Sequence, residues 1–256
     1  MATLRDVSIQ PLDVILFRGV DPVSKAICFM EARRLGHGDF SHAGLAITRE
    51  ALDLPFLEPG KVYVWESTLS AKEGFLARFT DKVPDAETKG VRFGVQLRDL
   101  ELVIPGYSSS GGKVAWCAYL GKRPPLEEVR RQLLALHAEY GHAPYAVGQL
   151  KVFGVVFPAL RGVRDRIGRR RDRLAHFRNV VLERARKPKR VVDADHHMFC
   201  SEWVATVYKR LCLGDMNGID FDPRLAAPVG PLTRRDLFAE PVYLESEDTA
   251  SQEVGA

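Results

Sequence analysis

The sequence predicts an α+β protein in which an antiparallel sheet packs against helices. Strand-like segments are frequent in the first 120 residues, and the two clearest helical patterns follow them. A block of strands followed by helices is typical of α+β proteins rather than of alternating strand and helix units. The chain has 256 residues, of which 46% are hydrophobic and 27% are charged. This composition excludes bulk disorder, collagen and a coiled coil, and the length is sufficient for a real hydrophobic core.

The expected strands are short apolar or alternating runs bounded by turn residues. They are Val14–Phe17, residues 42–48, residues 62–67, residues 95–104 and Lys113–Leu120. The alternation in the fourth run covers only part of its length, and the fifth follows a Ser- and Gly-rich stretch.

Three segments have helical patterns. Residues 24–36 form the first, with Ser24 as the expected N-cap. Residues 125–141 begin with a proline, place apolar or aromatic side chains on one face and end at a glycine. Residues 201–214 form the third, with Gly214 as the expected stop.

The positive charge is concentrated in one segment. The whole chain has a formal charge of +4, but residues 161–190 hold 13 Lys or Arg and only 3 Asp or Glu. This segment therefore carries +10 and the remainder carries −6. We expect a single domain, residues 1–256, with a basic insertion at about 161–190 and an acidic C-terminal tail at about 240–256.

The four cysteines are single residues and none belongs to a CxxC pair. A structural zinc site and a disulfide framework are therefore not expected, and neither is a cofactor. The N-terminus has no signal-peptide pattern, and the longest apolar run, residues 152–160, is too short to span a bilayer. We expect a protein that is not transmembrane and is not exported by a cleaved signal.

Two short motifs contain a cysteine and a histidine in positions suited to nucleophilic catalysis. Phe40-Ser41-His42-Ala43-Gly44 opens an expected strand, and Phe199-Cys200-Ser201-Glu202-Trp203 opens an expected helix. A helix N-terminus lowers the pKa of a thiol, and its free N–H groups can stabilise an oxyanion. A neighbouring imidazole can then act as base and acid. A small buried core cysteine is the alternative interpretation of Cys200.

Taken together, these motifs resemble the permuted NlpC/P60-like, papain-like cysteine hydrolases. This group includes YiiX-type proteins and is related to lecithin:retinol acyltransferase. The resemblance rests on DVILF (13–17), SHAGLAI (41–47), WES (65–67) and CSEWV (200–204). It covers roughly residues 11–120 and 125–240, and the histidine precedes the cysteine as in the permuted group. It implies a circularly permuted, papain-like sheet packed against helices.

The resemblance implies a role for each matching residue. Cys200 would be the nucleophile, His42 the general base, and Glu66 the third residue that orients the imidazole. Strands adjacent in the chain usually pair, so Glu66 could reach His42, although a carboxylate at a strand end is often only a surface group. Tyr145 would border the substrate, although a core tyrosine is the alternative. Ser41 and Ser201 are further candidates for substrate or oxyanion binding.

The histidines just before Cys200 allow two weaker interpretations. Asp193, Asp195, His196 and His197 lie close upstream, but their spacing matches no common zinc signature. His197 could instead pair locally with Cys200. We therefore expect no metal.

The favoured function is cysteine-dependent hydrolysis of an amide or related acyl bond in a peptide, peptidoglycan-like or lipid substrate. The alternative is a structural component, for example of a virus or phage particle, that retains the hydrolase fold. The protein would then be cytoplasmic or virion-associated. The basic segment would be a solvated insertion, or would dock on an acidic partner. Nucleic acid or anionic lipid is its least favoured partner, because base stacking needs aromatic residues and the segment has only Phe177.

Overall fold

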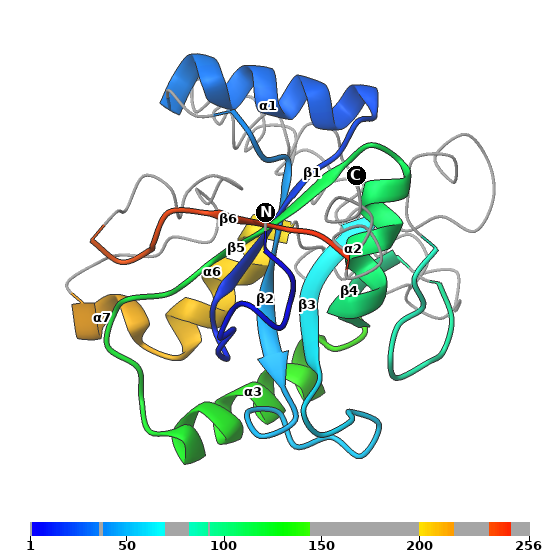
Figure 1. Cartoon of the computed structure of the whole chain (residues 1–256). Coiled ribbons are helices and arrows are strands. Elements are labelled where there is room, and N and C mark those ends of the chain that lie inside the picture. The colour runs from blue at the N-terminus through cyan, green and yellow to red at the C-terminus, as the bar shows by residue number, and fades with distance from the viewer. Residues whose placement is uncertain are drawn as a thin grey trace, which may run out of the picture.

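The computed structural model describes residues 2–35, 38–69, 82–91, 93–143, 200–217 and 236–246. It confirms an α+β architecture with one antiparallel sheet of six strands, in the order β4-β3-β2-β1-β5-β6 (Figure 1). The strands are β1 (Val14–Arg18), β2 (His42–Thr48), β3 (Val62–Leu69), β4 (Phe93–Asp99), β5 (Lys113–Cys117) and β6 (Val242–Leu244). Within the described part of the chain, no helix combines the length and apolarity needed to cross a membrane.

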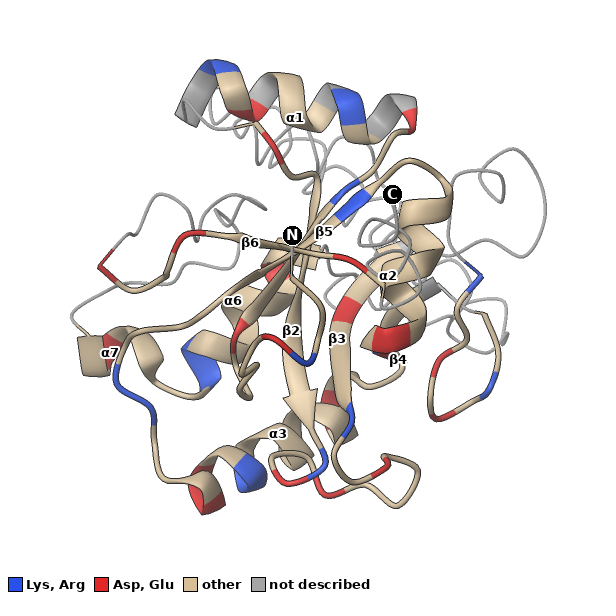
Figure 2. Cartoon of the chain, viewed as in Figure 1, with Lys and Arg blue, Asp and Glu red and all other residues tan. Residues whose placement is uncertain are grey.

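Helices lie on both sides of this sheet. They are α1 (Pro22–Leu35), α2 (Leu100–Ser109), α3 (Leu126–Tyr140), α6 (Cys200–Arg210) and α7 (Leu213–Asn217). Basic and acidic side chains are interspersed over the described elements rather than gathered by sign (Figure 2). The strongly basic residues 161–190 lie outside the described residues, as do the last ten residues of the acidic tail.

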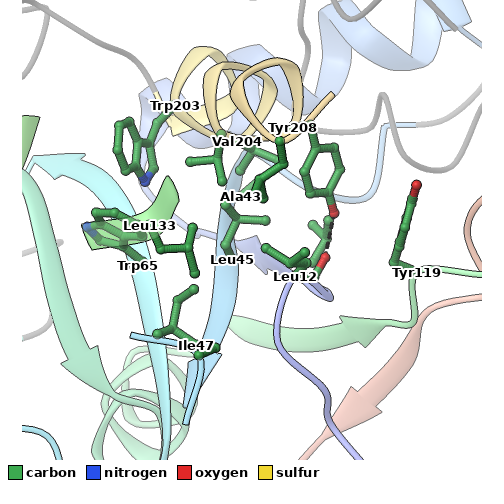
Figure 3. Packing of buried hydrophobic residues seen from close by; sticks show 14 of the residues in the cluster. Leu12, Ala43, Leu45, Ile47, Trp65, Tyr119, Leu133, Trp203, Val204 and Tyr208 are labelled. Atoms are coloured by element: carbon green, nitrogen blue, oxygen red, sulfur yellow. Dashed lines mark hydrogen bonds between the residues drawn. The ribbon is translucent and has the colours of Figure 1, made fainter. Parts of the chain in front are cut away.

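Strand alternation divides the buried side chains into two cores, one on each face of the sheet. Leu45 and Trp65 are opposite each other on one face, where α3 and α6 contribute Leu133 and Trp203. Figure 3 shows this first core, in which the Trp65 and Trp203 rings meet edge to face with centroids 4.6 Å apart. We call it the α6 face.

The opposite face packs against α2 and is called the α2 face. Its apolar members from the sheet include Ile15, Phe17 and Val64. Leu100, Val103 and Ile104 of α2 cover them. Both faces of the central strands are therefore buried, which explains why β1 is an uninterrupted apolar run in the sequence.

The two ends of the described chain meet at one edge of the sheet. β6 pairs with β5, and Ala2 forms a parallel bridge with Leu244. The first part of the expected acidic tail, residues 240–246, is thus not a free tail, because Val242–Leu244 completes a sheet edge. The signal was present in the short apolar run VYL.

The expected strand at residues 95–104 is wrong in its second half. β4 ends at Asp99, whose side chain accepts a hydrogen bond from the N–H of Glu101 and so caps α2. An Asp at an N-cap satisfies a donor that the first helical turn leaves free. Pro105 lies inside this helix, yet the helix continues to Ser109. The alternating polar and apolar residues lie on both sides of Asp99, so alternation alone does not show where the strand ends and the helix begins.

Other predicted boundaries also differ, and β3 continues to Leu69, two residues beyond its expected end. Asp21, and not Ser24, provides the cap of α1, since its carboxylate accepts from the N–H of Ser24. The third expected helix ends before Gly214: α6 stops at Arg210, the backbone turns at Cys212 with a φ of +53°, and α7 follows. β5 ends at Cys117, three residues earlier than expected. The helix expected at 125–141 is confirmed as α3, with Pro125 at its N-cap position and Gly141 at its C-cap position, where the N–H of Gly141 donates to the carbonyl of His137.

Candidate active site

Cys200 is the first residue of α6 and lies on the buried side of that helix. Residues three and four positions apart share a helix face, so Cys200 lines up with Trp203 and Val204. All three are buried. Farther along α6, the Tyr208 hydroxyl donates to the carbonyl of Leu12 at 2.6 Å, a bond that is visible in Figure 3. The core therefore fixes the rotation of α6 and directs the thiol toward the sheet.

His42 and Glu66 come from the neighbouring strands β2 and β3. The register pairs Ala46 with Val64, and His42 and Glu66 each lie an even number of residues away from that pair. Both side chains therefore belong to the α2 face. His42 Nε2 and a carboxylate oxygen of Glu66 form a short, buried ion pair. The sequence-based expectation that Glu66 reaches His42 is met by this geometry.

The ladder between β2 and β3 begins only at Leu45, opposite Trp65. The N–H of Ala46 donates to the carbonyl of Asp13, beside β1. Successive N–H groups along an antiparallel strand point to opposite sides, so the N–H of Ala43 points toward β3. Ala43 lies before the first paired residue, so no carbonyl of the β3 ladder accepts from this N–H. This N–H hydrogen bonds to the sulfur of Cys200 instead. The thiol thus reaches the margin where β2 and β3 begin to pair.

Gly44 allows β2 and β3 to approach closely at this point. A Cβ atom built on Gly44 would lie 2.5 Å from Val64 Cγ2 and 3.0 Å from the Cβ of Glu66. Contacts this short are sterically forbidden or very tight, so any larger residue would displace Glu66 or its strand. The glycine of the SHAG motif therefore leaves the space in which Glu66, the third residue of the expected triad, is held.

Cys200 and His42 are in direct contact. The thiol and the imidazole hydrogen bond to each other, and the N–H groups of Ala43 and Ser201 also point to the sulfur. Because Glu66 occupies Nε2 of His42, Nδ1 is the ring nitrogen that remains for the thiol. Cys200, His42 and Glu66 therefore form a continuous chain of three interacting groups.

A fourth group extends this chain and was not identified from the sequence. Arg98 on β4 is 1% exposed, and its Nε and Nη2 both lie 2.5 Å from Oε1 of Glu66. The available signal was an arginine inside the expected strand at 95–104. Without knowledge of the strand order, nothing in that strand indicated that Arg98 would meet Glu66.

The charges of these four groups alternate in sign and support one another. Burial alone would lower the pKa of His42, but the negative charges of Cys200 and Glu66 outweigh burial and raise it to about 10. Burial would raise the pKa of Cys200, but the His42 charge and the N–H groups of Ala43 and Ser201 hold it below its ordinary value. Both shifts favour a thiolate beside an imidazolium over a neutral thiol beside a neutral imidazole.

Glu66 stays ionised for a similar reason. Burial favours its neutral form, but the positive charges of Arg98 and His42 outweigh burial and lower the pKa of the carboxyl. An ionised carboxylate without such partners would be very costly to bury. The charges of the four groups sum to about zero, which explains how these groups can be buried beside the hydrophobic cores.

The remaining expected site residues have different positions. The hydroxyl of Ser41 lies between the N–H of Gly19, at 3.1 Å, and the carbonyl of Phe17, at 3.4 Å, so it joins β1 to the start of β2. Ser201 is buried and contributes its backbone N–H to the sulfur. Tyr145, His196 and His197 lie outside the described residues.

No group of three or more His, Cys, Asp or Glu side chains forms a metal-binding cluster among the residues that the structure describes. Comparison of the sequence with models of known protein families gave no match, and comparison with curated proteins gave none either.

Proposed function

We propose that the protein is a cysteine-dependent hydrolase of amide or related acyl bonds, with Cys200 as nucleophile, His42 as base and acid, and Glu66 as the group that orients the imidazole. The observation that carries the proposal is the continuous contact from Glu66 through His42 to a thiol at a helix N-terminus. A merely buried cysteine has no need of an ionised neighbour, because a neutral thiol packs as a small apolar group.

The proposed reaction has two stages. The Cys200 sulfur forms a bond to the substrate carbonyl carbon, and the carbonyl electrons move to oxygen. The Cys200 N–H, at the start of α6, stabilises this oxyanion. As the carbon bond to the leaving group breaks, His42 gives its proton to that group, which leaves a thioester on Cys200. His42 then takes a proton from water, and the hydroxide attacks the thioester carbonyl carbon. The bond from that carbon to sulfur breaks, which releases the acid and restores the Cys200 thiolate beside the His42 imidazolium.

The fold supports the same proposal at a finer level. A nucleophile opening a helix and a histidine opening a strand of an antiparallel sheet resemble the papain-like arrangement. In this chain His42 precedes Cys200, which is the order of the permuted NlpC/P60-like group. We therefore propose a circularly permuted, papain-like architecture for the chain.

The proposed substrates are peptides, peptidoglycan-like peptides or lipid acyl groups. Each contains a carbonyl that a thiolate can attack, and water could be replaced by another acceptor in an acyl transfer. The described residues around Cys200 do not discriminate among these classes, so the test must include all of them.

The test is acyl-enzyme trapping with a panel of peptide amides, peptidoglycan fragments and fatty acyl esters. The wild-type protein is quenched in acid, and the site of any added acyl group is found by mass spectrometry. We expect an acyl group on Cys200 with at least one substrate class. We also expect Cys200→Ala to abolish trapping, and His42→Ala to slow turnover by about a thousandfold or more.

Cys212→Ala is the matched control, because Cys212 is also a free thiol but is exposed. It should turn over substrate at the wild-type rate. A folded protein that forms no acyl-enzyme with any class, and whose Cys200 reacts no faster than Cys212, would contradict the proposal. That outcome would favour a structural component that retains a hydrolase fold.

A further inference from the structure

Arg98 and Glu66 are diagonal neighbours on β4 and β3, the pair of strands at one edge of the sheet. The register places Arg98 opposite Val64 and Glu66 opposite Gln96, so all four side chains share the α2 face. Glu66 is fully buried and Arg98 is 1% exposed. Oε1 of Glu66 contacts Arg98, while the other oxygen contacts His42. One carboxylate therefore joins two cations.

The elements around this carboxylate provide few other charges. From α2, the side chains packed against this face are the apolar Leu100, Val103 and Ile104 and the partly buried Tyr107. From β4, the neighbour of Arg98 on this face is the neutral Gln96. From β2 and α6, the titratable groups are His42 and, through it, Cys200. Among the described residues, Arg98 is the permanent positive charge in contact with Glu66.

A guanidinium remains charged at every accessible pH, whereas an imidazole does not. The charge on Glu66 therefore has a permanent partner that does not depend on the state of His42. A permanently ionised Glu66 favours the protonated imidazole, and a protonated imidazole favours the thiolate. In this way a residue that touches neither substrate nor sulfur can influence the nucleophile.

We propose that Arg98 is a positioning residue that keeps Glu66 ionised and oriented, and that it thereby fixes Cys200 and His42 as a thiolate and imidazolium pair. The inference rests on the proposed function for its catalytic meaning. Its physical content is the charge state of Cys200 in the absence of substrate, and this can be measured separately.

The experiment follows the alkylation rate of Cys200 by iodoacetamide as a function of pH, resolved by site with mass spectrometry. The variants are Arg98→Met, Arg98→Lys, Glu66→Gln and the double variant Arg98→Met with Glu66→Gln. We expect Arg98→Met to raise the pH of half-maximal alkylation by about one unit or more, a tenfold loss of rate below the midpoint. Arg98→Lys keeps the charge and should restore most of this shift.

The double variant should have the same midpoint as Glu66→Gln alone, because Arg98 acts through Glu66. It also removes the buried pair as a whole, which proteins tolerate better than the loss of one partner. It therefore keeps the test decisive if Arg98→Met does not fold. Arg123→Met is the matched control: Arg123 forms an ion pair at 2.6 Å with the buried Asp13, whose carboxylate also accepts from Trp116 and from the N–H of Tyr119.

A folded Arg98→Met protein with the wild-type midpoint would overturn the inference, and so would a double variant shifted beyond Glu66→Gln. A shift as large in Arg123→Met would also overturn it, because the effect would then be a general loss of structure. The proposed function fails separately. If no substrate is hydrolysed but the midpoints move as expected, Arg98 still controls the thiolate. If substrates are hydrolysed but the midpoints stay, only the role of Arg98 is lost.

Discussion

The α6 face and the α2 face of the sheet share the same strands but hold different kinds of side chain. On the α6 face, Trp65 and Trp203 belong to a large apolar core that fixes the helix. On the α2 face, the apolar core is smaller, and beside it lie His42, Glu66 and Arg98. The thiol comes from one side and its partners from the other, and they meet where β2 and β3 begin to pair.

This difference shows how the chain separates stability from reactivity. Apolar packing is tolerant of pH, so the α6 face holds Cys200 in place whatever the charge state of the site. The buried ion pairs of the α2 face contribute little net stability after desolvation, but they set the charge of the nucleophile. The two faces can therefore be perturbed separately.

The largest effect is expected from the α6 face. Trp203→Ala removes a fully buried side chain and should lower the free energy of unfolding by about 3–5 kcal/mol, because it leaves a cavity under α6. Urea unfolding at neutral pH measures this. Leu102→Ala is the control, because Leu102 is 52% exposed and its loss should change stability by less than about 0.5 kcal/mol. Equal effects of the two variants would contradict the assigned core.

The next effect concerns the margin between the two strands. Gly44→Ala should destabilise the protein by about 1–3 kcal/mol, because the new Cβ meets Val64 and Glu66. It should also slow the alkylation of Cys200 by iodoacetamide, since Glu66 is displaced. Gly90→Ala is the control, where a Cβ would meet no atom closer than 3.8 Å. Wild-type alkylation in Gly44→Ala would mean that the position of Glu66 does not depend on this glycine.

The pH dependence of stability gives a third test. The raised pKa of His42 stabilises the folded state fully below 6.5, and this contribution is lost as pH rises toward about 10. The lowered pKa of Cys200 contributes fully above 9.0, and this contribution is lost as pH falls. A folded pair that rests as a thiolate and imidazolium holds one proton on the imidazole between pH 6.5 and 9.0, where the unfolded chain holds one on the thiol. The summed contribution of His42 and Cys200 to stability is therefore constant within this range of pH and declines at lower and at higher pH.

The measurement is the difference in unfolding free energy between the wild type and the variant with both His42→Ala and Cys200→Ala, taken across pH. Taking this difference cancels the contributions of the other titratable groups to the pH dependence. A difference that rises or falls steadily between 6.5 and 9.0 would show that the pair does not rest as a thiolate and imidazolium.

The smallest effect is expected at Gln96. Its side-chain amide is buried, and within the described structure neither its oxygen nor its nitrogen has a hydrogen-bond partner. Because such a group loses its hydration without compensation, Gln96→Met should be neutral or should stabilise the protein by about 1 kcal/mol. Thermal unfolding would detect this. A clear loss of stability would mean that the amide has a partner, for which Glu66 is the nearest candidate across the strands.

The sequence was informative where local chemistry decides the structure. β1, β2 and α3 follow from apolar runs and flanking turn residues, and the places of Cys200 and His42 follow from the start of an expected helix and an expected strand. Glu66 was expected from the family resemblance at the end of a strand, but it lies inside β3, which continues to Leu69. The β4–α2 junction was missed because one capping residue, Asp99, ends an alternating run. Arg98 was missed because its role depends on which strand lies beside β3, and strand order is decided by the packing of the whole sheet.

The central claim is that Cys200 rests as a thiolate because His42 beside it is protonated. The most direct measurement is the ultraviolet absorbance of thiolate as a function of pH, taken as the difference between the wild type and Cys200→Ala. We expect one thiolate that persists well below the ordinary thiol pKa of 9.0 and that disappears from this range in His42→Ala. An absorbance that develops only near 9.0, and equally in His42→Ala, would contradict it.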